Sequence, residues 1–117
     1  MEDVTDASFR YVCKKYGADM LYTEFVSSDG LIRDVAGSLK KLEIFDYERP
    51  IGIQIYGHIP EAMVEAAVRS EKANPDLIDI NFGCPVNKIA KRGAGSGMMR
   101  EPDKLVQITK SVVDAVK

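Results

Sequence analysis

Three short apolar runs that alternate with segments of helical periodicity constrain the fold of this chain more than any other feature. The runs span residues 20–26, 51–57 and 77–82. Each is rich in aliphatic, aromatic or β-branched residues and is followed by glycine or polar residues, which is typical of buried strands. Strands that alternate with helices predict a parallel sheet with right-handed crossovers. The fold class is therefore α/β.

Helical periodicity flanks and separates these runs. Apolar stripes at helical spacing lie within residues 9–16, 31–42, 62–68 and 105–116. Thr5 or Asp6 can cap the first helix, and Gly17 lies where a glycine after a helix is favoured. The second stripe is looser and is interrupted by Gly37. Cys13 lies on the first stripe and is expected in the core.

Two architectures suit this order of elements. One is a small open doubly wound sheet, and the other is part of a (β/α)8 barrel, which needs roughly 250 residues when complete. Three strands cannot close on themselves, so strand edges and inner surface would stay unpaired. No strand is predicted before the first helix or after the last one. We therefore expect the chain to be part of a larger protein.

Composition narrows the class of protein. The net charge is −2, from 16 Lys and Arg against 18 Asp and Glu, which argues against binding nucleic acid by overall charge alone. No apolar run approaches the roughly 20 residues that span a bilayer, and no signal peptide opens the chain, so we expect a cytoplasmic protein. The two cysteines, Cys13 and Cys84, have no CxxC partner or nearby histidine, so no metal site is predicted.

The candidate catalytic residue is Cys84, which directly follows the third apolar run. Catalytic groups of α/β barrels gather at the carboxyl ends of the strands. A thiol there can act as a nucleophile or as a proton donor, and the ordinary thiol pKa of about 8.5 favours the donor. Cysteine is also a frequent small hydrophobic residue of protein cores. Position alone therefore leaves a structural role open.

The stretch after this cysteine is basic and rich in glycine. Lys88, Lys91 and Arg92 precede glycines at positions 93, 95 and 97. Met98 stands where a G-x-G-x-x-G dinucleotide motif requires its third glycine, and a basic loop instead of a strand precedes the glycines, so that motif is excluded. The stretch instead predicts a backbone that can approach a phosphate-bearing ligand closely. The alternative is that these charges form only a solvated surface.

Polar residues on the predicted strands are further site candidates. Gln54 lies in an otherwise apolar strand and needs a hydrogen-bond partner if buried, so it contacts a ligand or is a satisfied core amide. Asp79 and Asn81 share one face of the third strand, and Asn81 is nearer its end. Glu24 is a weaker candidate by the same logic. His58 is expected at the surface of a loop.

Four motifs in one order give the chain a family resemblance. They are Met-Glu-Asp-Val-Thr-Asp-x-x-Phe-Arg, Thr-Glu-Phe-Val-Ser-Ser, Gln-Ile-Tyr-Gly, and Asp-Ile-Asn-Phe-Gly-Cys-Pro-Val-Asn-Lys-Ile with Arg-Gly-Ala-Gly-Ser. Together they resemble the tRNA-dihydrouridine synthase family, especially its bacterial B-type members, over essentially all 117 residues. The resemblance implies a TIM (β/α)8 barrel with FMN as cofactor and NADPH as reductant. It also implies hydride transfer to C6 of a uridine in tRNA and protonation of C5 by a cysteine.

The resemblance assigns roles to individual residues. Cys84 matches the proton donor of the family, and Gln54 matches a glutamine that contacts the isoalloxazine ring. Asn81 matches an asparagine near the substrate pocket. Of the Pro-Met pair that contacts the flavin after the first barrel strand of the family, only Met1 remains, followed by Glu2.

Under this resemblance, residues 1–117 form a partial FMN-binding barrel domain without the first strand and the C-terminal half. The family's later basic residues, its phosphate site and its helical RNA-binding domain have no match, so we expect this part alone to be inactive. Lys88, Lys91 and Arg92 are expected to face RNA. The alternatives are a related FMN barrel reductase of the dihydroorotate or ene type, and a non-enzymatic small α/β binding module.

Overall fold

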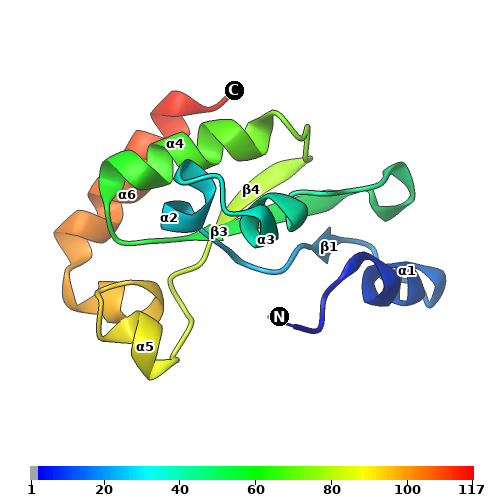
Figure 1. Ribbon diagram of the computed structural model, residues 1–117, viewed down its shortest axis with the longest axis horizontal. Coiled ribbons are helices and arrows are strands. Elements are labelled where there is room, and N and C mark those ends of the chain that lie inside the picture. Colours follow the sequence, from blue (N-terminus) through cyan, green and yellow to red (C-terminus); the bar gives the residue numbers. More distant parts are fainter. Residues whose placement is uncertain (1–2) are drawn as a thin grey trace.

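The sheet is parallel throughout. A computed structural model describes residues 3–117. Within them the strands are β1 Leu21–Tyr22, β2 Val26–Ser27, β3 Ile51–Tyr56 and β4 Leu77–Ile80. β3 is central, with β1 and β2 along one edge and β4 along the other (Figure 1). The predicted α/β class with parallel strands is confirmed.

Six α-helices and two 3₁₀ helices accompany this sheet in the described residues. In chain order they are α1 Ala7–Lys15, α2 Ser28–Ile32, α3 Ala36–Lys40, η1 Asp46–Glu48, α4 Pro60–Glu71, α5 Asn87–Ala90, η2 Gly95–Arg100 and α6 Pro102–Ala115. α4 connects β3 to its parallel neighbour β4, as the alternating pattern predicts. Across residues 3–117, no helix combines the length and the apolar character needed to cross a membrane.

The strand predicted over 20–26 is interrupted. Between its two pairings with β3, as β1 and as β2, it has three residues where β3 has two, which is the geometry of a β-bulge. Thr23 lies in the bulge and is 1% exposed. Its Oγ1 accepts the backbone N–H of Gln54 at 3.2 Å, so a side-chain oxygen replaces a backbone partner in the ladder.

Side-chain alternation along β3 divides the sheet into two faces. Ile53 and Ile55 are 0% exposed and lie in the core. Their register partners on β4, Ile78 and Ile80, pack against the same core. Gln54, between the two buried isoleucines, therefore points to the opposite face of the sheet. The sheet thus has one face that packs in the core and an opposite face that carries polar side chains.

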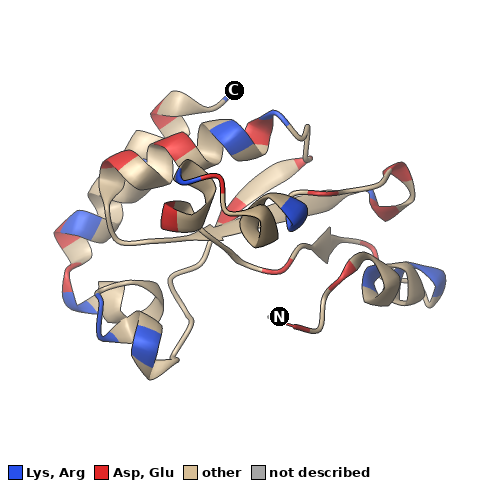
Figure 2. Cartoon of the chain, in the orientation of Figure 1, with Lys and Arg blue, Asp and Glu red and all other residues tan. Residues whose placement is uncertain are grey.

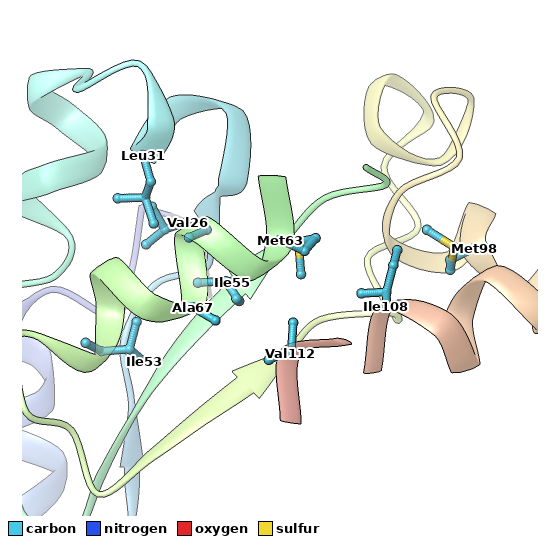
Figure 3. Close-up of a cluster of buried hydrophobic side chains, with 10 residues drawn as sticks. Val26, Leu31, Ile53, Ile55, Met63, Ala67, Met98, Ile108 and Val112 are labelled. Carbon is cyan, nitrogen blue, oxygen red and sulfur yellow. The ribbon is translucent and has the colours of Figure 1, made fainter. Parts of the chain in front are cut away.

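The core lies between the first of these faces and the helices α2, α4 and α6. α4 and α6 pack side by side over it (Figure 1). The buried members, most of them labelled in Figure 3, are Val26, Leu31, Ile53, Ile55, Met63, Ala66, Ala67, Met98, Ile108 and Val112. Burial of aliphatic side chains on one face of a sheet is the main stabilising term of such a layer.

The helical stripe predicted over 31–42 is divided between α2 and α3, and the break does not fall at Gly37. Asp34 adopts a positive φ of 53° and its N–H donates to the Leu31 carbonyl oxygen at 3.1 Å, which ends α2. Gly37 lies inside α3. Aspartate tolerates the left-handed region better than most residues, so it provides the turn without a glycine.

α1 begins as predicted, but its apolar stripe is not buried. Asp6 is the N-cap, and its Oδ1 accepts the N–H of Phe9 at 2.8 Å. Phe9 is 44% exposed and Cys13 is only half-buried, so the expectation that Cys13 lies in the core is wrong. The buried residue of α1 is Arg10, whose Nε donates to Glu48 Oε1 at 2.8 Å. This buried ion pair, and not the stripe, determines which side of α1 faces inward.

The strand order favours one of the two predicted architectures. β1 with β2, then β3, then β4 are neighbours in the order in which the chain visits them. Each strand of a (β/α)8 barrel pairs with the next one in this way, whereas a doubly wound sheet reverses its order at a switch point. The architecture is that of part of a TIM barrel.

Candidate active site

A cavity of about 890 Å³ lies at the carboxyl ends of β2, β3 and β4. β3 and the residues after it contribute Gln54, Tyr56 and His58 to its wall. The connection from β4 to α5, at the lower left of Figure 1, contributes Asn81 and Cys84. Catalytic groups of α/β barrels collect at this edge of the sheet. The cavity is therefore the candidate active site of the chain.

Most of the residues predicted from the sequence meet in this cavity. Gln54, Asn81, Cys84, Lys88 and Arg92 all line it, although β3 contributes the first and residues 81–92 contribute the others. The remaining basic residue of the cluster, at position 91, is exposed and is not part of the lining. The positions predicted at the start of the chain, 1 and 2, lie outside the described residues.

The backbone of Cys84 is held on both sides. Its N–H and that of Gly83 donate to Asn81 Oδ1, each at 3.0 Å. Its carbonyl oxygen accepts the N–H of Ser96 at 3.0 Å. Cys84 is 9% exposed, so its thiol is a buried group at the cavity wall. Such a group has a fixed position from which it can act on a bound molecule.

Gly95 shows why the stretch after Cys84 needs glycine. It has a φ of +54°, and a Cβ built on it would lie 2.6 Å from the Cys84 carbonyl oxygen. A side chain at this position would therefore push η2 away from the cysteine loop. The glycine supports the loop by close packing, while the predicted approach of this stretch to a phosphate stays a prediction.

A chain of side-chain hydrogen bonds connects the sheet to the cysteine loop. Gln54 Nε2 donates to Asp79 Oδ2 at 2.5 Å, and Gln54 Oε1 accepts from Asn81 Nδ2 at 2.9 Å. Gln54 and Asp79 are register partners on β3 and β4, so both side chains lie on the same face. Each amide nitrogen carries two N–H donors, and the described hydrogen bonds use one from each. The second N–H of Gln54 and of Asn81 takes part in none of the described hydrogen bonds.

The electrostatic character of the rim is basic. Between residues 80 and 100 the chain has Lys88, Lys91, Arg92 and Arg100 and no acidic residue. Figure 2 shows these charges on the α5 and η2 segment beside the loop that follows β4. A local excess of positive charge in a chain of net charge −2 favours an anionic ligand at this rim.

His58 is the clearest residue that the sequence patterns missed. It was expected at the surface of a loop, but it is half-buried and lines the cavity. Its place just after β3, at the same edge as Cys84, is the signal that identifies it. Lys41 also lines the cavity, and it pairs with Glu24 at 3.7 Å. Glu24 itself lines a smaller neighbouring cavity and not this one.

The sequence of the chain matches a family of known proteins. The family model for dihydrouridine synthase (Dus) matches residues 1–117. A probable tRNA-dihydrouridine synthase of Aquifex aeolicus is 40% identical over 119 residues, covering 100% of this chain and 37% of that protein. The tRNA-dihydrouridine synthase B of Vibrio vulnificus is 40% identical over 117 residues, covering 99% of this chain and 36% of that protein.

A probable tRNA-dihydrouridine synthase of Treponema pallidum is 40% identical over 113 residues, covering 96% of this chain and 33% of that protein. The chain thus spans about a third of the length of these curated relatives. The match nevertheless includes every residue of the cavity. On the family model and these relatives, the chain belongs to the dihydrouridine synthase family.

Proposed function

We propose that the intact protein reduces uridine in tRNA to 5,6-dihydrouridine, and that this chain contributes the proton donor, Cys84. The observation that carries the proposal is the convergence of Cys84, Gln54 and Asn81 on one cavity beside a basic rim, in a chain of this family. The relatives are named for the same reaction. Because the chain spans about a third of their length, the activity is assigned to the intact protein.

The reaction adds a hydride to C6 and a proton to C5 of the uracil ring, so that the C5=C6 double bond becomes a single bond. Reduced FMN, held in this cavity with Gln54 beside its ring, would supply the hydride, with NADPH as the reductant. The thiol of Cys84 supplies the proton to C5, and its S–H bond breaks as the C–H bond forms. The backbone hydrogen bonds of Cys84 to Asn81 and Ser96 hold it in place.

The residues of the cavity fit a flavin. The remaining N–H of Gln54 suits the carbonyl and ring-nitrogen acceptors of an isoalloxazine. Phe25 and Tyr56 line the same cavity, with ring centroids 4.9 Å apart and an edge-to-face contact. Aromatic walls with a few placed polar groups are typical of cofactor sites. The remaining N–H of Asn81, whose Oδ1 accepts the Cys84 N–H, suits an acceptor on the substrate.

The basic rim fits the phosphates of an RNA. The target uridine has to leave the base stack to reach a cavity of this kind, and phosphate contacts hold the flanking backbone in place. Replacement of Lys88, Lys91 and Arg92 by alanine in the intact protein should weaken tRNA binding and flatten its salt dependence. Unchanged affinity and salt slope would show that these charges are only solvated.

Replacement of Cys84 by alanine tests the central assignment. In the intact protein, dihydrouridine formation should fall by on the order of 10²–10⁴-fold, while oxidation of NADPH in the absence of tRNA should be retained. Cys13→Ala is the matched control, because Cys13 lies outside the cavity. Wild-type dihydrouridine formation by Cys84→Ala would show that Cys84 is structural.

A further inference from the structure

We propose that Asp79 is a positioning residue, whose carboxylate acts through Gln54 to fix the orientation of the Asn81 side chain that holds the backbone of Cys84. The proposal rests on the proposed function only in naming Cys84 as the proton donor. It is carried by three consecutive links: Asp79 to Gln54 at 2.5 Å, Gln54 to Asn81 at 2.9 Å, and Asn81 to the Cys84 N–H at 3.0 Å.

The two ends of this chain of hydrogen bonds have fixed polarity. A carboxylate only accepts hydrogen bonds, and a backbone N–H only donates them. The carboxylate of Asp79 stands at one end, and the N–H groups of Gly83 and Cys84 stand at the other. The side chains of Gln54 and Asn81, which lie between these ends, therefore have to present a donor toward Asp79 and an acceptor toward the loop N–H groups.

The two side chains between these ends are amides, which have one accepting and one donating end and could be turned either way. Asp79 requires the nitrogen of Gln54, which leaves Oε1 of Gln54 to face Asn81. Asn81 then has to present its nitrogen to Gln54 and its oxygen to the cysteine loop. One orientation of each amide satisfies all the links, and it is the orientation that both the Asp79 carboxylate and the loop N–H groups require.

The strand geometry brings Asp79 to this role. Asp79 and Gln54 are opposite each other in the register of β4 and β3. Asp79 and Asn81 are two residues apart in sequence and on the same face, so Gln54 reaches both. All three side chains are partly buried, and in such surroundings an unmatched polar end is costly.

The polarity argument predicts an unusual pattern in paired substitutions. In Asn81→Asp alone, Gln54 lies between two carboxylates, so its oxygen has to face one of them. Repulsion between that oxygen and the carboxylate at 81 should move the carboxylate away from the loop N–H groups, although it can still accept hydrogen bonds. In Asp79→Asn alone, the new amide still offers an oxygen to Gln54, and the effect is mild. In the double variant the amides can reverse: the nitrogen of the new Asn donates to Gln54 Oε1, and Gln54 Nε2 donates to the new Asp. The side chain at 81 is then held by Gln54, so its oxygen stays in place as the acceptor of the loop N–H groups.

Amide hydrogen exchange of Gly83 and Cys84 in the intact protein is the direct readout, because these N–H groups are the last link. Asn81→Asp should raise their exchange rates about 10-fold, and Asp79→Asn about 2–3-fold, as expected for one weakened hydrogen bond. The double variant should return close to wild type. Exchange that is as fast in the double variant as the two single effects multiplied would overturn the proposal.

A third substitution distinguishes the chain of hydrogen bonds through Gln54, called the relay below, from direct repulsion between the carboxylates at 79 and 81. In a Gln54→Leu background the relay is absent, so Asp79→Asn should no longer rescue Asn81→Asp. Rescue that survives Gln54→Leu would show repulsion through space and would also overturn the proposal. These exchange rates do not depend on the reaction. Full activity of Cys84→Ala would therefore refute the proposed function and leave the relay standing, and additive exchange effects would do the reverse.

Discussion

Gly95 offers the sharpest test of how the cysteine loop is supported, because two separate costs meet at this one residue. An added Cβ would lie 2.6 Å from the Cys84 carbonyl oxygen, 3.0 Å from the Cys84 Cβ and 3.2 Å from Ile89 Cγ2. The nearest of these atoms belongs to the backbone and already accepts the N–H of Ser96. It cannot move without loosening that hydrogen bond.

The expected cost of Gly95→Ala follows from these two terms. A non-glycine residue in the left-handed region costs roughly 1–2 kcal/mol, and overpacking of a filled site costs typically about 1–3 kcal/mol. We therefore expect the free energy of unfolding to fall by about 2–5 kcal/mol if the terms add. The cysteine loop should shift as well, which exposes the Cys84 thiol.

Substitutions at two other glycines allow the backbone cost and the packing cost to be measured separately. Gly17 has a φ of +93° but open space around a built Cβ, so Gly17→Ala measures the backbone term alone. Gly37 has neither a positive φ nor a neighbour within 4 Å and lies inside α3. Gly37→Ala should therefore be neutral or should stabilise by up to about 1 kcal/mol.

Urea unfolding of the three variants in the intact protein gives the free energies, and peptide-level mass spectrometry of alkylated Cys84 gives the exposure of the thiol. Gly95→Ala should be the least stable of the three and should be alkylated fastest at Cys84. Equal stability of Gly95→Ala and Gly17→Ala, with unchanged alkylation, would refute the argument that close packing requires glycine at 95.

Two further predictions concern the charges that support the fold. Glu48→Gln should lower the free energy of unfolding by about 3 kcal/mol, because Arg10 is left buried beside a neutral partner. The side chains of Arg10 and Glu48 are 5% and 0% exposed in the wild type. The exposed pair of Arg69 with Glu65 provides the control, and Glu65→Gln should lower the free energy of unfolding by under about 1 kcal/mol. The hydrogen bond from the Ile51 N–H at 2.7 Å, together with the charge of Arg49, lowers the pKa of Asp76 below its usual range. Asp76 therefore stabilises the fold above an unfolded pKa of about 3.9, and this contribution is lost as the pH falls through the lower folded pKa. The gap in unfolding free energy between wild type and Asp76→Asn should accordingly be largest at neutral pH and should close in acid; a gap that is constant with pH would contradict this.

Sequence patterns predicted the parts of the fold in which burial and local propensity favour the same structure. The runs at 51–56 and 77–80 have isoleucine at alternate positions that face the core, so burial and strand propensity agree there. The candidates Gln54, Asn81 and Cys84 converge because parallel strands end at a common edge, which needs no knowledge of loops. Strand position is therefore a sufficient guide to most of this site.

The patterns failed where a single long-range contact overrides local preference. Thr23 replaces a backbone partner in the ladder and splits the first strand, and Arg10 turns α1 toward Glu48 and away from its own stripe. Both contacts join residues that are 31 or 38 positions apart. Asp79 was seen to share a face with Asn81, but its role needs the register of β3 against β4, which hydrophobic patterns do not give.

The same register ties the stability of the fold to the geometry of the site. A shift of β3 by one residue against β4 would turn Ile53 and Ile55 out of the core and turn Gln54 into it. The burial of these isoleucines under α4 therefore excludes a one-residue shift and keeps Gln54 on the same face of the sheet as Asp79. The position of the cysteine loop depends on this pairing through Asn81. Substitutions at Ile53 or Ile55 that loosen the core should thus disturb Cys84, although neither residue lines the cavity.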